Sequence, residues 1–126
     1  MNGATFRLLR TTMGLEIGAV AAELDINRRT IERWESGKNP LPGFAQIWIE
    51  GRWQAFLDEI GDYLAPLEDL PEGTQVDVAV YGSVESLRRA GSNRGLGEVN
   101  ALNGGIAICL GLMDLSPSAS LVPVEE

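Results

Sequence analysis

Three arginines fall within the short stretch RRTIER, and a helix would gather them on one surface. At helical spacing, Ile31 and Trp34 lie on an inner face, whereas Arg28, Arg29 and Arg33 lie on the outer face with a glutamate. A helix fits the major groove of B-DNA, where a guanidinium can donate two hydrogen bonds to guanine or can hold a phosphate. The stretch therefore predicts a surface that contacts DNA.

Two short helices joined by a tight turn position these arginines. Apolar residues spaced three and four apart up to Leu24 form the inner face of a first helix, and residues 25–26 form the turn. Asn27 is a good N-cap for the second helix, because its side-chain oxygen can accept a backbone N–H of the first turn. We expect this helix to run over residues 28–36 and to end at Gly37.

At this point the sequence resembles the Cro/CI-type helix-turn-helix regulators, also called the XRE or lambda-repressor-like family. The resemblance covers roughly the first third of the chain, and its cap, core, basic and glycine positions fall at the family spacing. The residues that carry it are Leu9, Arg10, Gly14, Leu15, Ala21, Ile26 and the run NRRTIERWESGK from Asn27 to Lys38. The chain departs from the family at Glu16 and Ile17, where a polar cap and a glutamine usually stand, and at Asp25, where glycine is usual.

The resemblance implies which residues contact DNA and which are structural. The DNA-binding candidates are Asn27, Arg28, Arg29, Thr30, Glu32, Arg33, Lys38 and Asn39. The last two are placed to meet the phosphate backbone, and the alternative is that they are only loop residues. Arg10 corresponds to a family position whose guanidinium pairs with the glutamate at Glu35, and the alternative is a solvated helix charge. Arg10, Trp34 and Glu35 are therefore expected to be structural.

Composition excludes several other classes of protein. The chain of 126 residues has no histidine and one cysteine, Cys109, so it lacks the commonest general base and cannot form an intrachain disulfide. We expect no enzyme activity, no cofactor and no bound metal. No apolar run approaches the length of a membrane span, and no leader is evident, so we expect a cytoplasmic protein without a membrane partner.

The net charge of −8 is unfavourable for DNA binding, but the charges are unevenly distributed. Residues 1–40 have six basic and five acidic side chains, which gives a net charge of +1. Residues 41–126 have four arginines and thirteen acidic side chains, which gives −9. Contact with DNA should therefore be confined to one edge of the molecule.

Residues 44–64 predict one long helix with two apolar stripes. The first stripe, Phe44, Ile47 and Trp48, would close the N-terminal core. The second has the spacing of a heptad seam, which suits a partner helix. Its members are Ile49, Trp53, Phe56, Ile60, Tyr63 and Leu67. The alternative is an ordinary amphipathic helix that packs on its own chain.

Beyond a Pro-rich, acidic linker at residues 65–75, the chain predicts a strand and two helices. Residues 76–81 alternate as a strand does, and no second strand is clear, so we expect pairing with the same strand of another subunit. Residues 84–90 predict a short helix, and residues 98–113 predict a helix that is apolar on nearly all sides and therefore buried. Small residues spaced by four form a ridge on it that lets another backbone approach: Ala101, Gly105 and Cys109.

Together these features predict a mainly α protein. Residues 1–65 would form a lambda-repressor-like helix-turn-helix bundle with its linker helix, residues 76–115 a small α+β dimerisation domain, and residues 116–126 a disordered tail. In element order the second half is similar to that of a subset of these regulators, which includes anti-CRISPR-associated repressors of phages and mobile elements. The dimerisation candidates are Trp53, Phe56, Ile60, Ala101, Gly105 and Cys109.

The leading functional hypothesis is a homodimeric, sequence-specific transcription regulator. It would be an autoregulating repressor that binds an inverted-repeat operator in double-stranded DNA. The alternative is an antitoxin-type module, in which the DNA-binding domain is autoregulatory and the C-terminal half binds a second, unknown protein. A co-transcribed toxin gene would favour the alternative.

Overall fold

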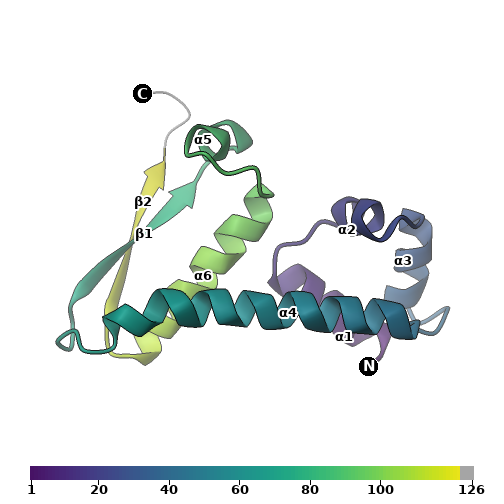
Figure 1. Cartoon of the computed structure of the whole chain (residues 1–126), viewed down its shortest axis with the longest axis horizontal. Coiled ribbons are helices and arrows are strands. Elements are labelled where there is room, and N and C mark those ends of the chain that lie inside the picture. Colours follow the sequence, from purple (N-terminus) through teal and green to yellow (C-terminus); the bar gives the residue numbers. More distant parts are fainter. Residues whose placement is uncertain (123–126) are drawn as a thin grey trace. The chain divides into compact units, whose positions relative to one another are not determined.

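The computed structural model describes residues 1–122 and shows a mainly helical chain with one small parallel sheet (Figure 1). The elements are α1 (Gly3–Thr12), α2 (Ile17–Leu24), α3 (Arg28–Glu35), α4 (Gly43–Leu64), a 3-10 turn (Ala65–Leu67), β1 (Gln75–Tyr81), α5 (Val84–Arg89), α6 (Leu96–Leu112) and β2 (Ser116–Val122). The predicted mainly α class is confirmed. The chain divides into two compact units, Met1–Phe56 and Leu57–Glu126, so the boundary lies inside α4 and not in the linker predicted at residues 65–75.

The first unit packs α1, α2, α3 and the first part of α4 around an aromatic core. The ring of Phe6 lies 5.9 Å from the ring of Trp34 and 6.3 Å from that of Trp48, measured between centroids. The apolar stripe predicted to close this core is partly wrong, because the side chains of Phe44 and Ile47 are 54% and 74% exposed, although the ring of Phe44 lies 6.0 Å from that of Trp34. Ala45, which has no exposed surface, faces the core instead. Buried aliphatic residues complete the core: Met13, Leu15, Val20, Ile31 and Ile49.

The start of α1 lies directly against the end of α3. Asn2 caps α1, because its side-chain oxygen accepts the backbone N–H of Thr5 at 2.9 Å. The next residue, Gly3, is buried, and a Cβ atom added to it would lie only 1.6 Å from the carbonyl oxygen of Trp34. Only glycine fits at this position, because any side chain would overlap the backbone of α3.

The second unit consists of a two-stranded parallel sheet, the helices α5 and α6, and the last turns of α4. β1 pairs with β2 from Gln75↔Ser116 to Tyr81↔Val122. Parallel strands need a crossover connection, which α5 and α6 provide, and α6 packs on both strands (Figure 1). Its buried side faces a core made of Val78, Leu87, Val99, Leu102, Ile106, Leu110 and Leu115.

The structure contradicts the prediction of a disordered tail for residues 116–122, which form β2. The rest of that tail, residues 123–126, lies outside the described residues. The prediction that β1 has no partner strand in its own chain is wrong for the same reason. The serines of β2 stabilise the pairing, because the hydroxyls of Ser118 and Ser120 donate to the carboxylate of Asp77 on β1 at 3.1 and 2.8 Å.

Two asparagines of α6 bond the C-terminal part of β1 on the side away from β2. The amide of Asn100 donates to the carbonyl of Tyr81 at 2.9 Å, and its oxygen accepts the Tyr81 N–H at 3.1 Å. Asn103 donates to the carbonyl of Ala79 at 2.8 Å. These contacts satisfy both backbone groups of Tyr81 and the carbonyl of Ala79, which have no neighbouring strand among the described residues, so the C-terminal part of this edge is protected within the chain.

Arg94 connects the loop before α6 to the last turns of α4 within the second unit. Its guanidinium donates to Glu59 at 2.8 Å and to Glu98 at 3.2 Å. The hydrogen bond with Glu59 is the main reason why the pKa of Arg94 is raised above its ordinary value. The two carboxylates therefore hold this side chain, one of only three arginines in residues 57–126, in a structural position.

Candidate nucleic-acid interface

Helix α3 has one buried and one exposed side. Ile31 is fully buried and Trp34 is 3% exposed, so both predicted inner residues lie in the core. The side chains on the other side are exposed: Arg28, Arg29, Glu32 and Arg33. Thr30 is half-buried, at the border between the two sides. This arrangement agrees with the helical spacing predicted from the sequence and places three guanidiniums in solvent.

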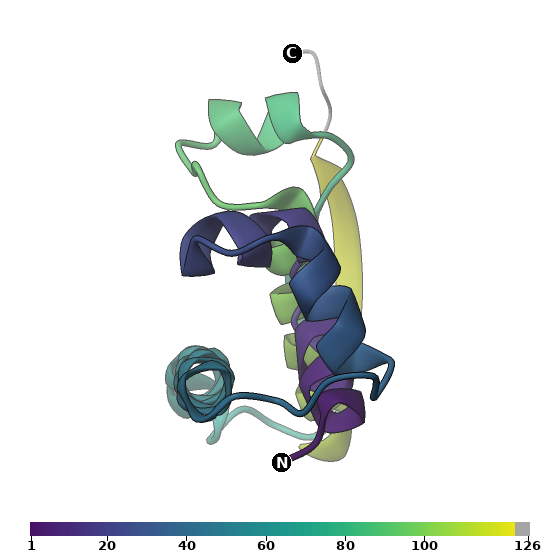
Figure 2. The ribbon, with the colours of Figure 1, turned by 90° about the vertical axis from the view of Figure 1, so that its right-hand side faces the viewer.

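The turn between α2 and α3 fixes where α3 begins. Asp25 ends α2 in the left-handed conformation with φ of 54°, and the N–H of Ile26 donates to the carbonyl of Ala21 at 3.0 Å. Asn27 then caps α3, because its side chain accepts the N–H of Arg29 at 2.8 Å. Figure 2 shows that the two helices run in different directions on either side of this short turn. The predicted cap is confirmed, and Asp25 adopts the conformation for which glycine is the usual residue.

An ion pair joins α1 to the end of α3. The Nε of Arg10 donates to Glu35 Oε2 at 2.7 Å and its Nη2 to Oε1 at 2.8 Å, while Nη1 donates to the carbonyl of Leu15 at 3.0 Å. The side chains of Arg10 and Glu35 are only 12% and 6% exposed. The hydrogen bond with Glu35 is the main reason why the pKa of Arg10 is raised above its ordinary value. The predicted pairing is confirmed, and the solvated alternative is wrong.

The exposed side of α3 and the loop after it form a polar hollow of about 280 Å³. The residues that line it are Arg29, Glu32, Arg33, Ser36 and Lys38. Three cations against one carboxylate make it a suitable surface for an anionic group such as a phosphate. Arg28 lies beside the hollow, with its Nε 3.8 Å from Glu32 Oε2 in an exposed pair.

The loop that carries Lys38 and Asn39 folds back onto the end of α3. The N–H of Asn39 donates to the carbonyl of Arg33 at 3.1 Å, and that of Gly37 donates to the carbonyl of Trp34 at 3.1 Å. Gly37 has φ of 81°, which explains why a glycine ends this helix. The side chains of Lys38 and Asn39 are exposed. The loop therefore extends the basic surface of α3 by one cation.

The predicted dimerisation residues are not gathered on one exposed surface. On α4, Phe56 and Ile60 are 9% and 8% exposed, so they are buried within their own chain, and Trp53 is half-buried and stacks on Phe56 at 5.8 Å. These contacts favour the alternative that α4 packs on its own chain. The small-residue ridge of α6 is half-buried at all three positions: Ala101, Gly105 and Cys109. Ile108 and Leu112 of the same helix are more exposed than this ridge, and the sequence spacing did not identify them.

Two specific features are absent from the residues that the structure describes, a metal-ligand cluster and a membrane-length helix. Among residues 1–122 there is no group of three or more cysteine, aspartate or glutamate side chains arranged to hold a metal ion. Within the same residues, no helix combines the length and the apolar character needed to cross a bilayer.

Comparison with known proteins gives no assignment. No protein-family model matches the chain, and no curated protein matches it.

Proposed function

We propose that the protein is a sequence-specific DNA-binding regulator in which α2, the turn at Asp25 and α3 act as a helix-turn-helix. The observation that carries this proposal is the two-sided α3, with Ile31 and Trp34 in the core and three guanidiniums in solvent. A helix of this kind can enter the major groove while the rest of the unit stays outside it. The resemblance described from the sequence favours a repressor.

Arg29 is the residue best placed to read a base. At about 100° per residue, Arg29 lies roughly 140–160° around the helix axis from Ile31 and Trp34, so it points away from the core and toward the floor of a groove. Its position in the first turn of α3, directly after the cap at Asn27, also brings it near the base edges. A bidentate contact to guanine is the commonest specific contact that arginine makes in the major groove.

Arg33 and Lys38 are better placed to hold the phosphate backbone. Both line the hollow at the C-terminal end of α3, and phosphate contacts fix the position of a protein on the duplex without reading sequence. Arg28 is partly engaged by Glu32, whose carboxylate also keeps other anions away from that side of the helix. The proposed division of roles is therefore a base contact at Arg29 and backbone contacts at Arg33 and Lys38.

We further propose that the protein binds as a homodimer to an inverted repeat. A two-fold dimer places two copies of α3 on one face of the duplex, with half-site centres about 34–36 Å apart. The acidic remainder of the chain, at −9 over residues 41–126, supports contact through a single edge, because it is repelled by the phosphates on either side.

The test begins with selection of binding sites from a random pool of DNA duplexes by the full-length protein. Binding titrations then compare the selected duplex, each of its single-base variants and a shuffled duplex. Arg29→Ala should cost about 1–3 kcal/mol per half-site and relax the preference at one base position. Arg33→Ala and Lys38→Ala should weaken binding to all duplexes alike and reduce its salt dependence.

Arg89→Ala is the matched control, because it removes an exposed arginine from the second unit and should leave binding to the selected duplex unchanged. Failure to enrich any sequence from the pool contradicts sequence-specific binding. A uniform loss of affinity in Arg28→Ala, Arg29→Ala and Arg33→Ala, with no change in base preference, contradicts the assignment of α3 as the reading helix.

A further inference from the structure

The outer edge of β2 is a strand edge without a partner in the described residues. The N–H of Ser116 donates to the carbonyl of Thr74 at 2.9 Å, so the backbone of Ser116 faces β1. Because the direction of backbone groups alternates along a strand, every second residue of β2 then faces away from β1. The residues whose backbone groups point outward are Pro117, Ala119 and Leu121. Proline is compatible with this position, because its missing N–H would face the open edge.

The two edges of the sheet differ in how they are protected. At the edge of β1, asparagine side chains of α6 bond the carbonyl of Ala79 and both backbone groups of Tyr81. Edges that stay exposed in soluble proteins usually carry charged residues or bulges that prevent pairing with another chain. The sequence from Leu115 to Val124 contains no charged residue. The edge of β2 therefore has the character of a strand that is covered by a partner.

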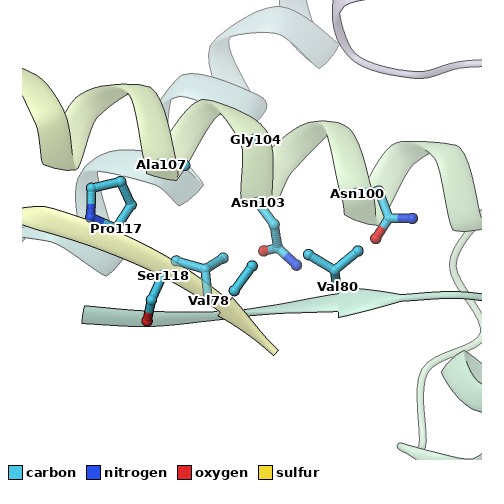
Figure 3. A pocket seen from close by; sticks show the side chains of 9 residues that line it. Val78, Val80, Asn100, Asn103, Gly104, Ala107, Pro117 and Ser118 are labelled. Carbon is cyan, nitrogen blue, oxygen red and sulfur yellow. The ribbon is translucent and has the colours of Figure 1, made fainter. Parts of the chain in front are cut away.

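An exposed apolar face of α6 lies next to this edge. Ile108 and Leu112 are 68% and 80% exposed and lie one turn apart. A Cβ atom added at Gly104 or Gly111 would meet no atom within 4 Å, so the helix backbone is open on the same side. This side adjoins the groove of about 220 Å³ between α6 and the strands, which Gly104 lines together with Pro117 and Ala119 of β2 (Figure 3).

Charge restricts which partner this face fits. Residues 41–126 carry a net charge of −9, so two copies of the chain repel each other over most of that region. Neither the stretch from Val99 to Met113 nor that from Leu115 to Val124 has a charged residue. The combined face of α6 and β2 thus allows two copies to meet without placing like charges against each other.

We propose that this face binds a second copy of the chain. The outer edges of the two β2 strands pair antiparallel about a two-fold axis and make a four-stranded sheet in the order β1-β2-β2-β1. An axis perpendicular to the sheet keeps both α6 helices on the same side of it, where they pack through Ile108, Leu112 and the exposed glycines. The inference rests on the homodimer of the proposed function and locates its contact, but its test uses no DNA.

The first measurement is the mass of the full-length protein at micromolar concentration, determined by size-exclusion chromatography with light scattering. Ile108→Lys places a charge in the contact, and Ala119→Pro removes an outward N–H without removing a bond to β1. Both variants should have the mass of one chain with wild-type helicity by circular dichroism, whereas the wild type should have the mass of two. Val84→Lys, at a 50% exposed position on α5, is the matched control and should remain a dimer.

A single-chain mass for the wild type contradicts the proposal. Two-chain masses for both Ile108→Lys and Ala119→Pro contradict the assigned face while leaving the homodimer intact. If a variant fails to fold, hydrogen exchange of the wild type tests the pairing of the two β2 strands instead. The amides of Ala119 and Leu121 should be protected like that of Ser118, because they donate to the partner strand, and exchange at the rate of an open strand contradicts the pairing. Loss of DNA binding by a protein that still dimerises concerns the proposed function alone.

Discussion

The ion pair between Arg10 and Glu35 gives the sharpest test of how the first unit is held together. We predict that Glu35→Gln destabilises this unit by about 3–5 kcal/mol, because it leaves a largely buried guanidinium without its counter-charge. Whole domains are stable by only about 5–15 kcal/mol, so this single change removes a large share of the stability. The contacts at 2.7 and 2.8 Å and the exposures of 12% and 6% justify using the magnitude of a buried pair.

The assay is urea unfolding followed by tryptophan fluorescence. All three tryptophans, Trp34, Trp48 and Trp53, lie in the first unit, so their emission reports on that unit. Arg10→Met combined with Glu35→Met should recover most of the loss, because replacing both charges by apolar groups removes the desolvation cost as well as the attraction. Glu32→Gln is the control: it breaks the exposed pair with Arg28, which should contribute at most about 0.5 kcal/mol.

The pH dependence follows from the direction of the pKa shift at Arg10. A raised pKa in the folded state means that the contribution of this group to stability is complete below the ordinary range of arginine and is lost only as the pH rises through the folded value. Raising the pH from neutral to about 10 should therefore leave the contribution of Arg10 intact. A change of less than about 1 kcal/mol in Glu35→Gln, or a double variant as unstable as the single one, would refute the reasoning.

Three further substitutions test the packing around α3, each by the same urea unfolding. Trp34→Ala should destabilise the first unit by about 3–5 kcal/mol through the cavity that it leaves; a stable variant that only loses DNA binding would mean that Trp34 faces the DNA. Gly3→Ala should cost more than about 1 kcal/mol, because its Cβ would overlap the Trp34 carbonyl. Gly18→Ala is the control and should be neutral or stabilising, because the space around its Cβ is open. Equal effects of the two substitutions on stability would contradict the close contact at Gly3. Asp25→Gly should stabilise by up to about 1 kcal/mol, because glycine adopts the left-handed conformation at lower cost, and a destabilised variant would show that the Asp25 side chain contributes more than the strain costs.

The local features of the first unit could be predicted from the sequence because local signals determine them. The cap at Asn27, the stop at Gly37 and the inner face of Ile31 and Trp34 follow from residue type and helical spacing. The pairing of Arg10 with Glu35 came from the family resemblance, since nothing local joins residues so far apart. The close contact at Gly3 had no such signal, because it depends on where α1 meets α3.

The second unit was harder to predict because its defining contact is distant in the sequence. The strand β2 has the alternation of a half-buried strand, with serines at Ser116, Ser118 and Ser120 separated by Pro117, Ala119 and Leu121. This pattern is hard to recognise in the sequence, because the serines and the proline have low hydrophobicity. The partner strand, β1, also lies about forty residues earlier in the chain. The exposure of Ile108 and Leu112 was also missed, because α6 is apolar on nearly all sides and its spacing alone does not tell which side is covered.

The parallel pairing of β1 with β2 also determines the order in which the two units can fold during synthesis. β1 finds its only described partner in residues 116–122, so the sheet cannot form until those residues have been added to the chain. At about 5–20 residues per second, the 66 residues from Leu57 to Val122 take about 3–13 s to make. During that interval all residues of the first unit, α3 included, have already been added, whereas β1 and the apolar α6 lack β2 from the time each is made. In a nascent chain the basic surface of α3 can therefore form before the sheet does. Until β2 is made, β1 and α6 are the segments most exposed to aggregation.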